Sequence, residues 1–157
     1  MSKLAQTALA LALVLSAPAA ADAPLFIVEP SQLPFDLGPG APGNSPNRVS
    51  NRHTAAANSA ANPGNSSETR RNSPTNPENE KRVVFTSDGR VVGYYVTSTA
   101  GVLNIFDVNG RRVAYRPARG TRSLFSSQGR WCGTVSGTVA GGLALGMTRE
   151  CAARLGW

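Results

Sequence analysis

The C-terminal half of the chain repeats one short motif three times: a phenylalanine, then two residues, then Asp, Asn or Gln, and then Gly-Arg. The copies begin at Phe85, Phe106 and Phe125, roughly 20 residues apart, which is the length of two short strands and two turns. Between them lies a second phase of the repeat, in which glycines Gly101, Gly120 and Gly141 each lead into an apolar segment. The spacing predicts a series of antiparallel hairpins and does not indicate a chemical function.

Residues 82–157 are expected to form about seven short strands, near 82–86, 90–97, 101–107, 111–117, 121–126, 130–137 and 141–146. The Asp-Gly and Asn-Gly pairs of the repeat supply positive φ at the turns. Several strands are apolar on both faces, which fits a sheet that is curled or covered on its second side. Thr148 can cap a short helix over 149–155.

The predicted fold class is therefore mainly all-β. We expect a small antiparallel meander, built from three hairpin repeats into a barrel or a curled sheet, with a short C-terminal helix. A long disordered N-terminal region precedes it.

The first 21 residues have the pattern of a secretory signal peptide. Lys3 is followed by an apolar run over 4–15 and then by small residues, with cleavage expected after Ala21. The run is shorter than a comfortable membrane span, so the mature chain is not expected to be transmembrane. The protein is predicted to be periplasmic or secreted.

Two further segments precede the globular domain of residues 82–157. Residues 22–37 contain an apolar island, Leu25-Phe-Ile-Val28, that could be an edge strand, a docking motif for a partner, or a loose tail. Residues 38–81 are rich in Pro, Asn and Ser and almost lack large apolar residues, so a disordered linker is predicted. His53, the only histidine, lies in that linker and is expected to have no role.

Cys132 and Cys151 are the only two cysteines, and both lie in the globular part. In an exported chain they are expected to form a disulfide that ties the helix to the sixth strand of the domain. A loop of this length contributes about 3 kcal/mol in the chain-entropy model, which matters for a domain with a small core.

The net charge of +7 is concentrated in the globular part, where ten arginines stand against three acidic residues. Such a domain attracts polyanions, although arginines of this kind also occur simply as solvated surface. Five of them are close together around one hairpin with no acidic residue among them: Arg111, Arg112, Arg116, Arg119 and Arg122. Guanidinium groups gathered in this way can hold phosphate or carboxylate in bidentate fashion, so this set is the candidate anion or partner site.

No arrangement of residues typical of catalysis is found in the globular part. It contains no histidine, and its three carboxylates fall at turns or at the start of the helix, so we expect no enzyme activity, no metal and no cofactor. Aromatic side chains could instead stack on rings of a partner, although those on strands are more often core. The aromatic candidates are Tyr94, Tyr95, Tyr115, Trp131 and Trp157.

The function predicted from the sequence is non-catalytic binding of an anionic cell-envelope polymer or an acidic protein surface through the Arg-rich hairpin. No nucleic-acid motif is present. Two alternatives remain open at this point: a structural or accessory envelope protein that docks to another subunit, and a secreted inhibitor that inserts a rigid hairpin into an enzyme.

Overall fold

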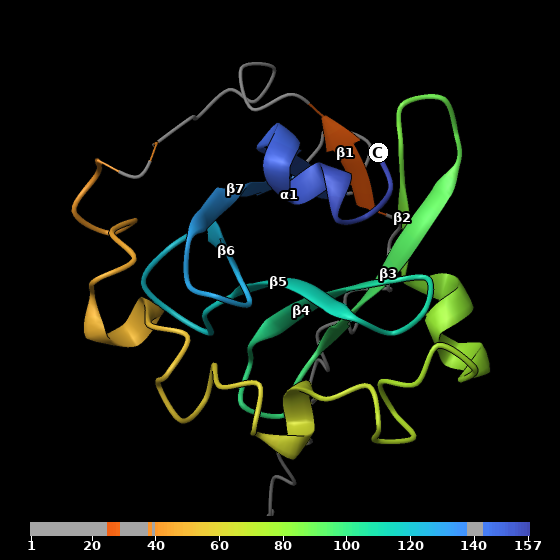
Figure 1. The fold of residues 1–157 in the computed structure, drawn as a ribbon, viewed down its shortest axis with the longest axis horizontal. Coiled ribbons are helices and arrows are strands. Elements are labelled where there is room, and N and C mark those ends of the chain that lie inside the picture. The colour runs from red at the N-terminus through yellow and green to blue at the C-terminus, as the bar shows by residue number, and fades with distance from the viewer. Residues whose placement is uncertain (1–24, 29–37, 39, 138–142) are drawn as a thin grey trace, which may run out of the picture.

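The computed structural model describes residues 25–28, 38, 40–137 and 143–157, and the expected signal peptide with its cleavage site lies outside this part. The described residues form eight strands that follow one another around a closed barrel in chain order (Figure 1). The strands are β1 (Leu25–Val28), β2 (Val83–Phe85), β3 (Val91–Thr97), β4 (Leu103–Asp107), β5 (Arg112–Arg116), β6 (Ser123–Ser126), β7 (Trp131–Gly137) and β8 (Leu143–Met147). The helical segments are the 3-10 turns η2 (Val49–Asn51), η3 (Pro63–Asn65) and η4 (Pro77–Lys81) and the α-helix α1 (Arg149–Ala153). The all-β prediction with a short C-terminal helix is confirmed.

The Gly-Arg repeats form the tight turns of three hairpins. Gly89, Gly110 and Gly129 have φ of 82°, 83° and 81°, and no other residue type in the described part has positive φ. In each turn the glycine N–H donates to the carbonyl three residues earlier, as from Gly89 to Thr86 at 2.9 Å. This is the three-residue hairpin loop, a type I turn closed by a left-handed glycine.

The phenylalanine of each repeat marks a break in strand register. The pairing shifts between Val84 and Phe85 in β2, between Ile105 and Phe106 in β4, and between Leu124 and Phe125 in β6. A bulge bends its strand and increases the local twist. Three such bends at regular spacing help the meander curve round on itself.

Strand β1 closes the barrel. It runs parallel to both of its neighbours, pairing Leu25 with Leu143 of β8 and with Val84 of β2. Ile27 is fully buried within the barrel interior. Of the possibilities that the sequence left open for this island, the structure therefore shows a strand paired on both sides.

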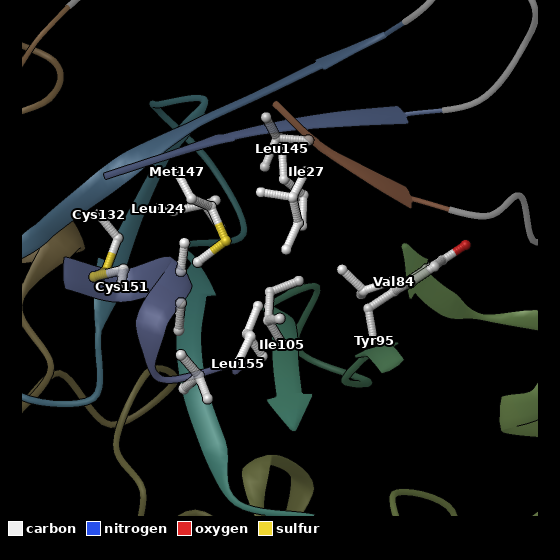
Figure 2. Close-up of a cluster of buried hydrophobic side chains, with 14 of the residues drawn as sticks. Ile27, Val84, Tyr95, Ile105, Leu124, Cys132, Leu145, Met147, Cys151 and Leu155 are labelled. Carbon is white, nitrogen blue, oxygen red and sulfur yellow. A yellow bond between two sulfur atoms is a disulfide. The ribbon is translucent and has the colours of Figure 1, made fainter. Parts of the chain in front are cut away.

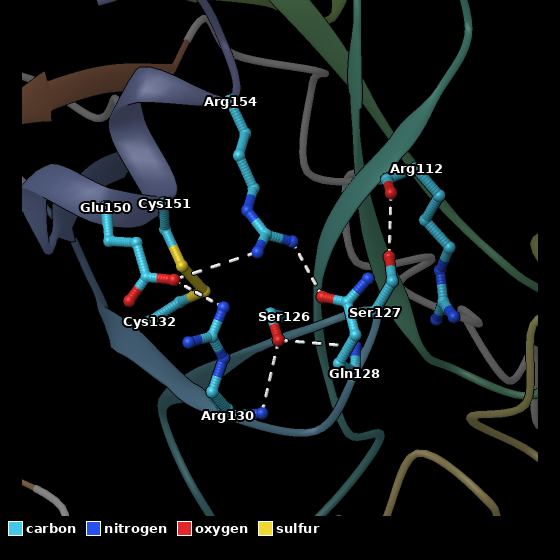
Figure 3. The surroundings of a disulfide bond; sticks show 9 residues. All are labelled: Arg112, Ser126, Ser127, Gln128, Arg130, Cys132, Glu150, Cys151 and Arg154. Atoms are coloured by element: carbon cyan, nitrogen blue, oxygen red, sulfur yellow. Dashed lines mark hydrogen bonds and ion pairs between the residues drawn. A yellow bond between two sulfur atoms is a disulfide. The ribbon is translucent and has the colours of Figure 1, made fainter.

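The barrel interior is filled by apolar side chains, and α1 contributes to it from one end. Ile105, Leu124 and Leu145 point towards the centre from different strands, and Leu155 reaches them from beyond α1 (Figure 2). The predicted disulfide between Cys132 on β7 and Cys151 on α1 is present. On the same helix, Glu150 forms ion pairs with Arg130 and Arg154, which reinforce the attachment (Figure 3).

The outer face of the barrel is also covered, by a coil formed by residues 40–81. Figure 1 shows this segment, orange through yellow to green, passing around the outside of β5, β4 and β3. A disordered linker was predicted for 38–81, whereas the structure gives residues 40–81 a regular path of consecutive turns. Each heptad contains two turns closed by backbone hydrogen bonds, such as Arg48 N–H to Ser45 O and Asn51 N–H to Arg48 O.

An asparagine at every seventh position holds the coil together. These six residues, here called the asparagine ladder, are Asn44, Asn51, Asn58, Asn65, Asn72 and Asn79, and each is at most 6% exposed. From Asn51 onward, every Nδ2 of the ladder donates to the carbonyls eight and six residues earlier, at 2.7–3.1 Å. Buried polar groups that are satisfied in this way allow order without a large apolar core.

The ladder is attached to the barrel through polar tips of otherwise buried strand residues. The hydroxyl of Tyr94 donates to Asn72 O, and that of Tyr115 to Asn51 O, both at 2.6 Å. The amide of Asn104 donates to Asn65 Oδ1 at 3.0 Å. The covered second face explains why strands such as β3 are buried on both sides.

Candidate functional site

The five arginines predicted to form one anion site do not share a role. Arg112 lies under the coil, where its Nε donates to Asn104 Oδ1 at 2.7 Å and its Nη1 to Asn58 O at 2.8 Å. Its guanidinium carbon also lies 4.7 Å from the centre of the Tyr115 ring, a cation–π arrangement. Burial lowers the pKa of Arg112 to about 10. Arg112 therefore joins the coil to the barrel, and we remove it from the candidate site.

The other four arginines lie at opposite ends of β5. Arg111 is exposed and occupies the turn before the strand, while Arg116 ends the strand, next to the loop of residues 117–122 that carries Arg119. Only the second group, Arg116 with Arg119 and Arg122, is brought together by the fold.

Arg116 is half-buried at the base of this group. Burial lowers its pKa, and the positive charge of Arg122 lowers it further, so the two guanidinium groups are close enough to interact. The Nε of Arg116 is buried and has no hydrogen-bond partner within the described residues. Arg119 and Arg122 are exposed.

A fourth arginine approaches from the coil. A Cβ placed on Gly43 would lie 3.3 Å from Gly120 O and 3.8 Å from an Nη atom of Arg48, so the Arg48 side chain and the 117–122 loop meet at Gly43. The coil begins here, where Asn44 accepts a hydrogen bond from the Thr121 hydroxyl at 2.7 Å. Ordering of the coil thus adds a basic residue that the sequence analysis did not include.

Several carboxylates of the described residues are engaged elsewhere. Glu150 pairs with Arg130 and Arg154, and Glu78 with Lys81. Asp107 accepts backbone N–H groups of its own turn. The pKa of Asp88 is lowered, chiefly by the hydrogen bond from Thr86. Within the described part of the chain, the arginines at 48, 116, 119 and 122 form no ion pair.

A pocket of about 470 Å³ opens beside this basic group. It is lined by residues 41, 43 and 44 of the coil, residues 120–122 and Thr134 of β7, and the lining is largely apolar. The Thr134 hydroxyl is buried and has no hydrogen-bond partner among the described residues. Arg122 is the charged residue of the lining.

The predicted aromatic candidates are mostly structural. Tyr94 stacks on Phe106 and Tyr115 packs against Phe125, with ring centroids 5.1 and 5.8 Å apart. Tyr95 is buried, and Trp131 packs against the Tyr115 cluster. Trp157 keeps 37% of its surface exposed and lies beside Arg149, Ala152 and Ala153 of α1.

His53 has a packing role. A Cβ on Gly129 would lie 2.5 Å from His53 Nδ1, so the imidazole lies directly against the third hairpin turn. Across the described ranges, no three His, Cys, Asp or Glu side chains gather as a metal site would require.

Sequence reasoning missed the coil and with it Arg48, although a signal was present. The asparagines at 44, 51, 58, 65, 72 and 79 recur at a strict interval of seven, which composition alone does not register.

In the part of the chain that the structure describes, no helix combines the length and apolar character needed to cross a bilayer. The chain matches no protein-family model, and comparisons with curated proteins and with solved structures give no match.

Proposed function

We propose that this chain is an exported, non-catalytic binding domain that recognises an anionic cell-envelope partner. The site is the basic group Arg48, Arg116, Arg119 and Arg122, called the basic end below. It replaces the hairpin-wide site predicted from the sequence, because Arg112 is used within the fold and Arg111 lies at the other end of β5.

The observation that carries the proposal is the lack of any carboxylate partner for these four arginines among the described residues. By contrast, Arg130 and Arg154 pair with Glu150, and Arg112 donates to Asn104 and Asn58 within the fold. Like charges held together raise the local positive potential, which attracts anions and orients them.

Strand addition through the 25–28 island has less support than it had from the sequence. Both edges of β1 are hydrogen-bonded within the barrel, so a partner strand has no free edge there.

The test is co-sedimentation of the protein with isolated peptidoglycan and with lipopolysaccharide at low and high salt. We expect binding that falls steeply with salt and is lost in an Arg119→Ser/Arg122→Ser variant. The matched control is Arg70→Ser/Arg149→Ser, which removes the same charge from two exposed positions outside the basic end. Equal loss in both variants would show that only net charge matters, and the site would be refuted.

A further inference from the structure

The three hairpin repeats align in sequence from their shared Gly-Arg pair, and at one position the first two share a tyrosine that the third lacks. Tyr94, Tyr115 and Thr134 all come four residues after the Arg of their repeat. In the first two repeats the tyrosine pairs across the sheet with the phenylalanine of the next repeat, Phe106 or Phe125. In the third, Thr134 pairs with Gly146.

The aromatic pairs fill the space between barrel and coil. Each of these tyrosine rings lies on its phenylalanine and directs its hydroxyl to a carbonyl of the asparagine ladder. Tyr94 reaches Asn72 and Tyr115 reaches Asn51, so a step of 21 residues along the barrel matches a step of three heptads along the coil.

At the third repeat both aromatic rings are missing, and the pocket beside Thr134 lies there. Its volume of about 470 Å³ falls within the range of ligand pockets, roughly 300–1,000 Å³. Thr134 is 95% buried, and its hydroxyl, which has no partner among the described residues, offers a donor and an acceptor to a bound group. A buried hydroxyl without a partner is costly unless a ligand or water satisfies it.

Arg122 gives this pocket a charge preference. It lies in the lining, it is exposed, and it forms no ion pair in the described part of the chain. Arg116 close by reinforces its positive field. An apolar pocket with one guanidinium at its edge suits a flat apolar group that carries an anion.

We propose that the pocket lined by residues 41, 43 and 44, residues 120–122 and Thr134 binds small hydroxylated aromatic carboxylates. The ring takes the place of the aromatic pair that the third repeat lacks, the carboxylate pairs with Arg122, and a hydroxyl bonds with Thr134. This inference rests on the proposed function, because Arg122 serves in both, and it adds a small-molecule ligand of one chemical class at the same end of the barrel.

The experiment is a titration of the isotopically labelled protein with 4-hydroxyphenylacetate, followed by amide chemical shifts of Thr134 and residues 120–122. The comparison compounds are 4-hydroxyphenylethanol, which lacks the charge, and 4-hydroxycyclohexylacetate, which lacks the aromatic ring. We expect each to bind about tenfold or more weakly than the probe, because each loses one of the three recognition elements.

Two variants locate the binding. Thr134→Tyr restores the residue of the first two repeats, so it should fill the pocket and abolish binding without lowering the melting temperature. Arg122→Gln is at an exposed position and should fold normally while weakening binding about ten- to hundredfold. Arg70→Gln serves as the charge control and should bind within twofold of the wild type.

The outcomes separate this inference from the proposed function. No shift at Thr134 with the probe, or unchanged binding in both pocket variants, overturns the inference, whatever the polymers do. The proposed function fails independently if polymer sedimentation is insensitive to loss of Arg119 and Arg122. Probe binding that Thr134→Tyr abolishes and Arg122→Gln weakens establishes the pocket.

Discussion

Replacing Asn65 by alanine tests whether the asparagine ladder holds the coil on the barrel. Its side chain donates to Ala57 O at 2.7 Å and to Ser59 O at 3.0 Å, and it accepts from Asn104 at 3.0 Å. A typical buried hydrogen bond contributes about 1 kcal/mol net, so the variant should lose about 3 kcal/mol of unfolding free energy. With a urea dependence of about 2 kcal/mol per molar, the unfolding midpoint should fall by about 1.5 M.

Two further variants isolate the cause. Asn65→Asp keeps the size and shape but removes the two donors, so at neutral pH it should cost at least as much as alanine. Asn47→Ala is the matched control, since that exposed side chain makes no hydrogen bond within the described residues, and it should change stability by less than about 0.5 kcal/mol. If the Asn65 variants unfold at the same urea concentration as Asn47→Ala, the ladder does not hold the coil.

Three further predictions concern other parts of the fold. A Cys132→Ala/Cys151→Ala variant should lose about 3 kcal/mol of unfolding free energy, as expected for a disulfide across a sequence separation of 19. Unfolding of this variant at the same urea concentration as the oxidised wild type would contradict the prediction. Burial raises the pKa of both Tyr94 and Tyr115 to about 12. The contribution of these tyrosines to stability is therefore complete below pH 10 and is lost as the pH rises to 12. Ultraviolet absorbance that shows Tyr94 and Tyr115 ionising near pH 10 in the still-folded protein would refute the raised pKa values. Arg112→Lys should destabilise the fold by about 2 kcal/mol, because the bonds of the guanidinium to Asn104 and Asn58 are lost. Polymer binding should stay within twofold of the wild type. If a fully stable Arg112→Lys variant lost binding, Arg112 would belong to the binding site after all.

The strands and turns could be predicted because local residues determine them. Left-handed glycines such as Gly89 and Gly110 are required wherever a three-residue hairpin turns, and their spacing in the sequence sets the strand lengths. The disulfide followed from the presence of only two cysteines.

The coil could not be predicted from composition, because the rule for disorder counts apolar surface. Its order comes from buried amide side chains such as Asn58 and Asn72, which satisfy backbone carbonyls that water would otherwise solvate. The role of Arg112 was misjudged for the same reason: without the coil, that face of β5 would be open to solvent. The pairing of β1 depends on strands far away in the sequence, and no local pattern encodes it.

The position of β1 makes closure of the barrel depend on β8. Six other strands, β2 to β7, separate β8 from β1 in the chain, so β1 stays without that neighbour until β8 has been synthesised. Contacts between such distant segments form slowly, because the conformational entropy of the intervening chain is lost before the strand pairing contributes any stability. A molecule truncated before β8 would keep its hairpins but could not close the barrel between β7 and β1. The two unpaired strand edges would then be open to aggregation or degradation.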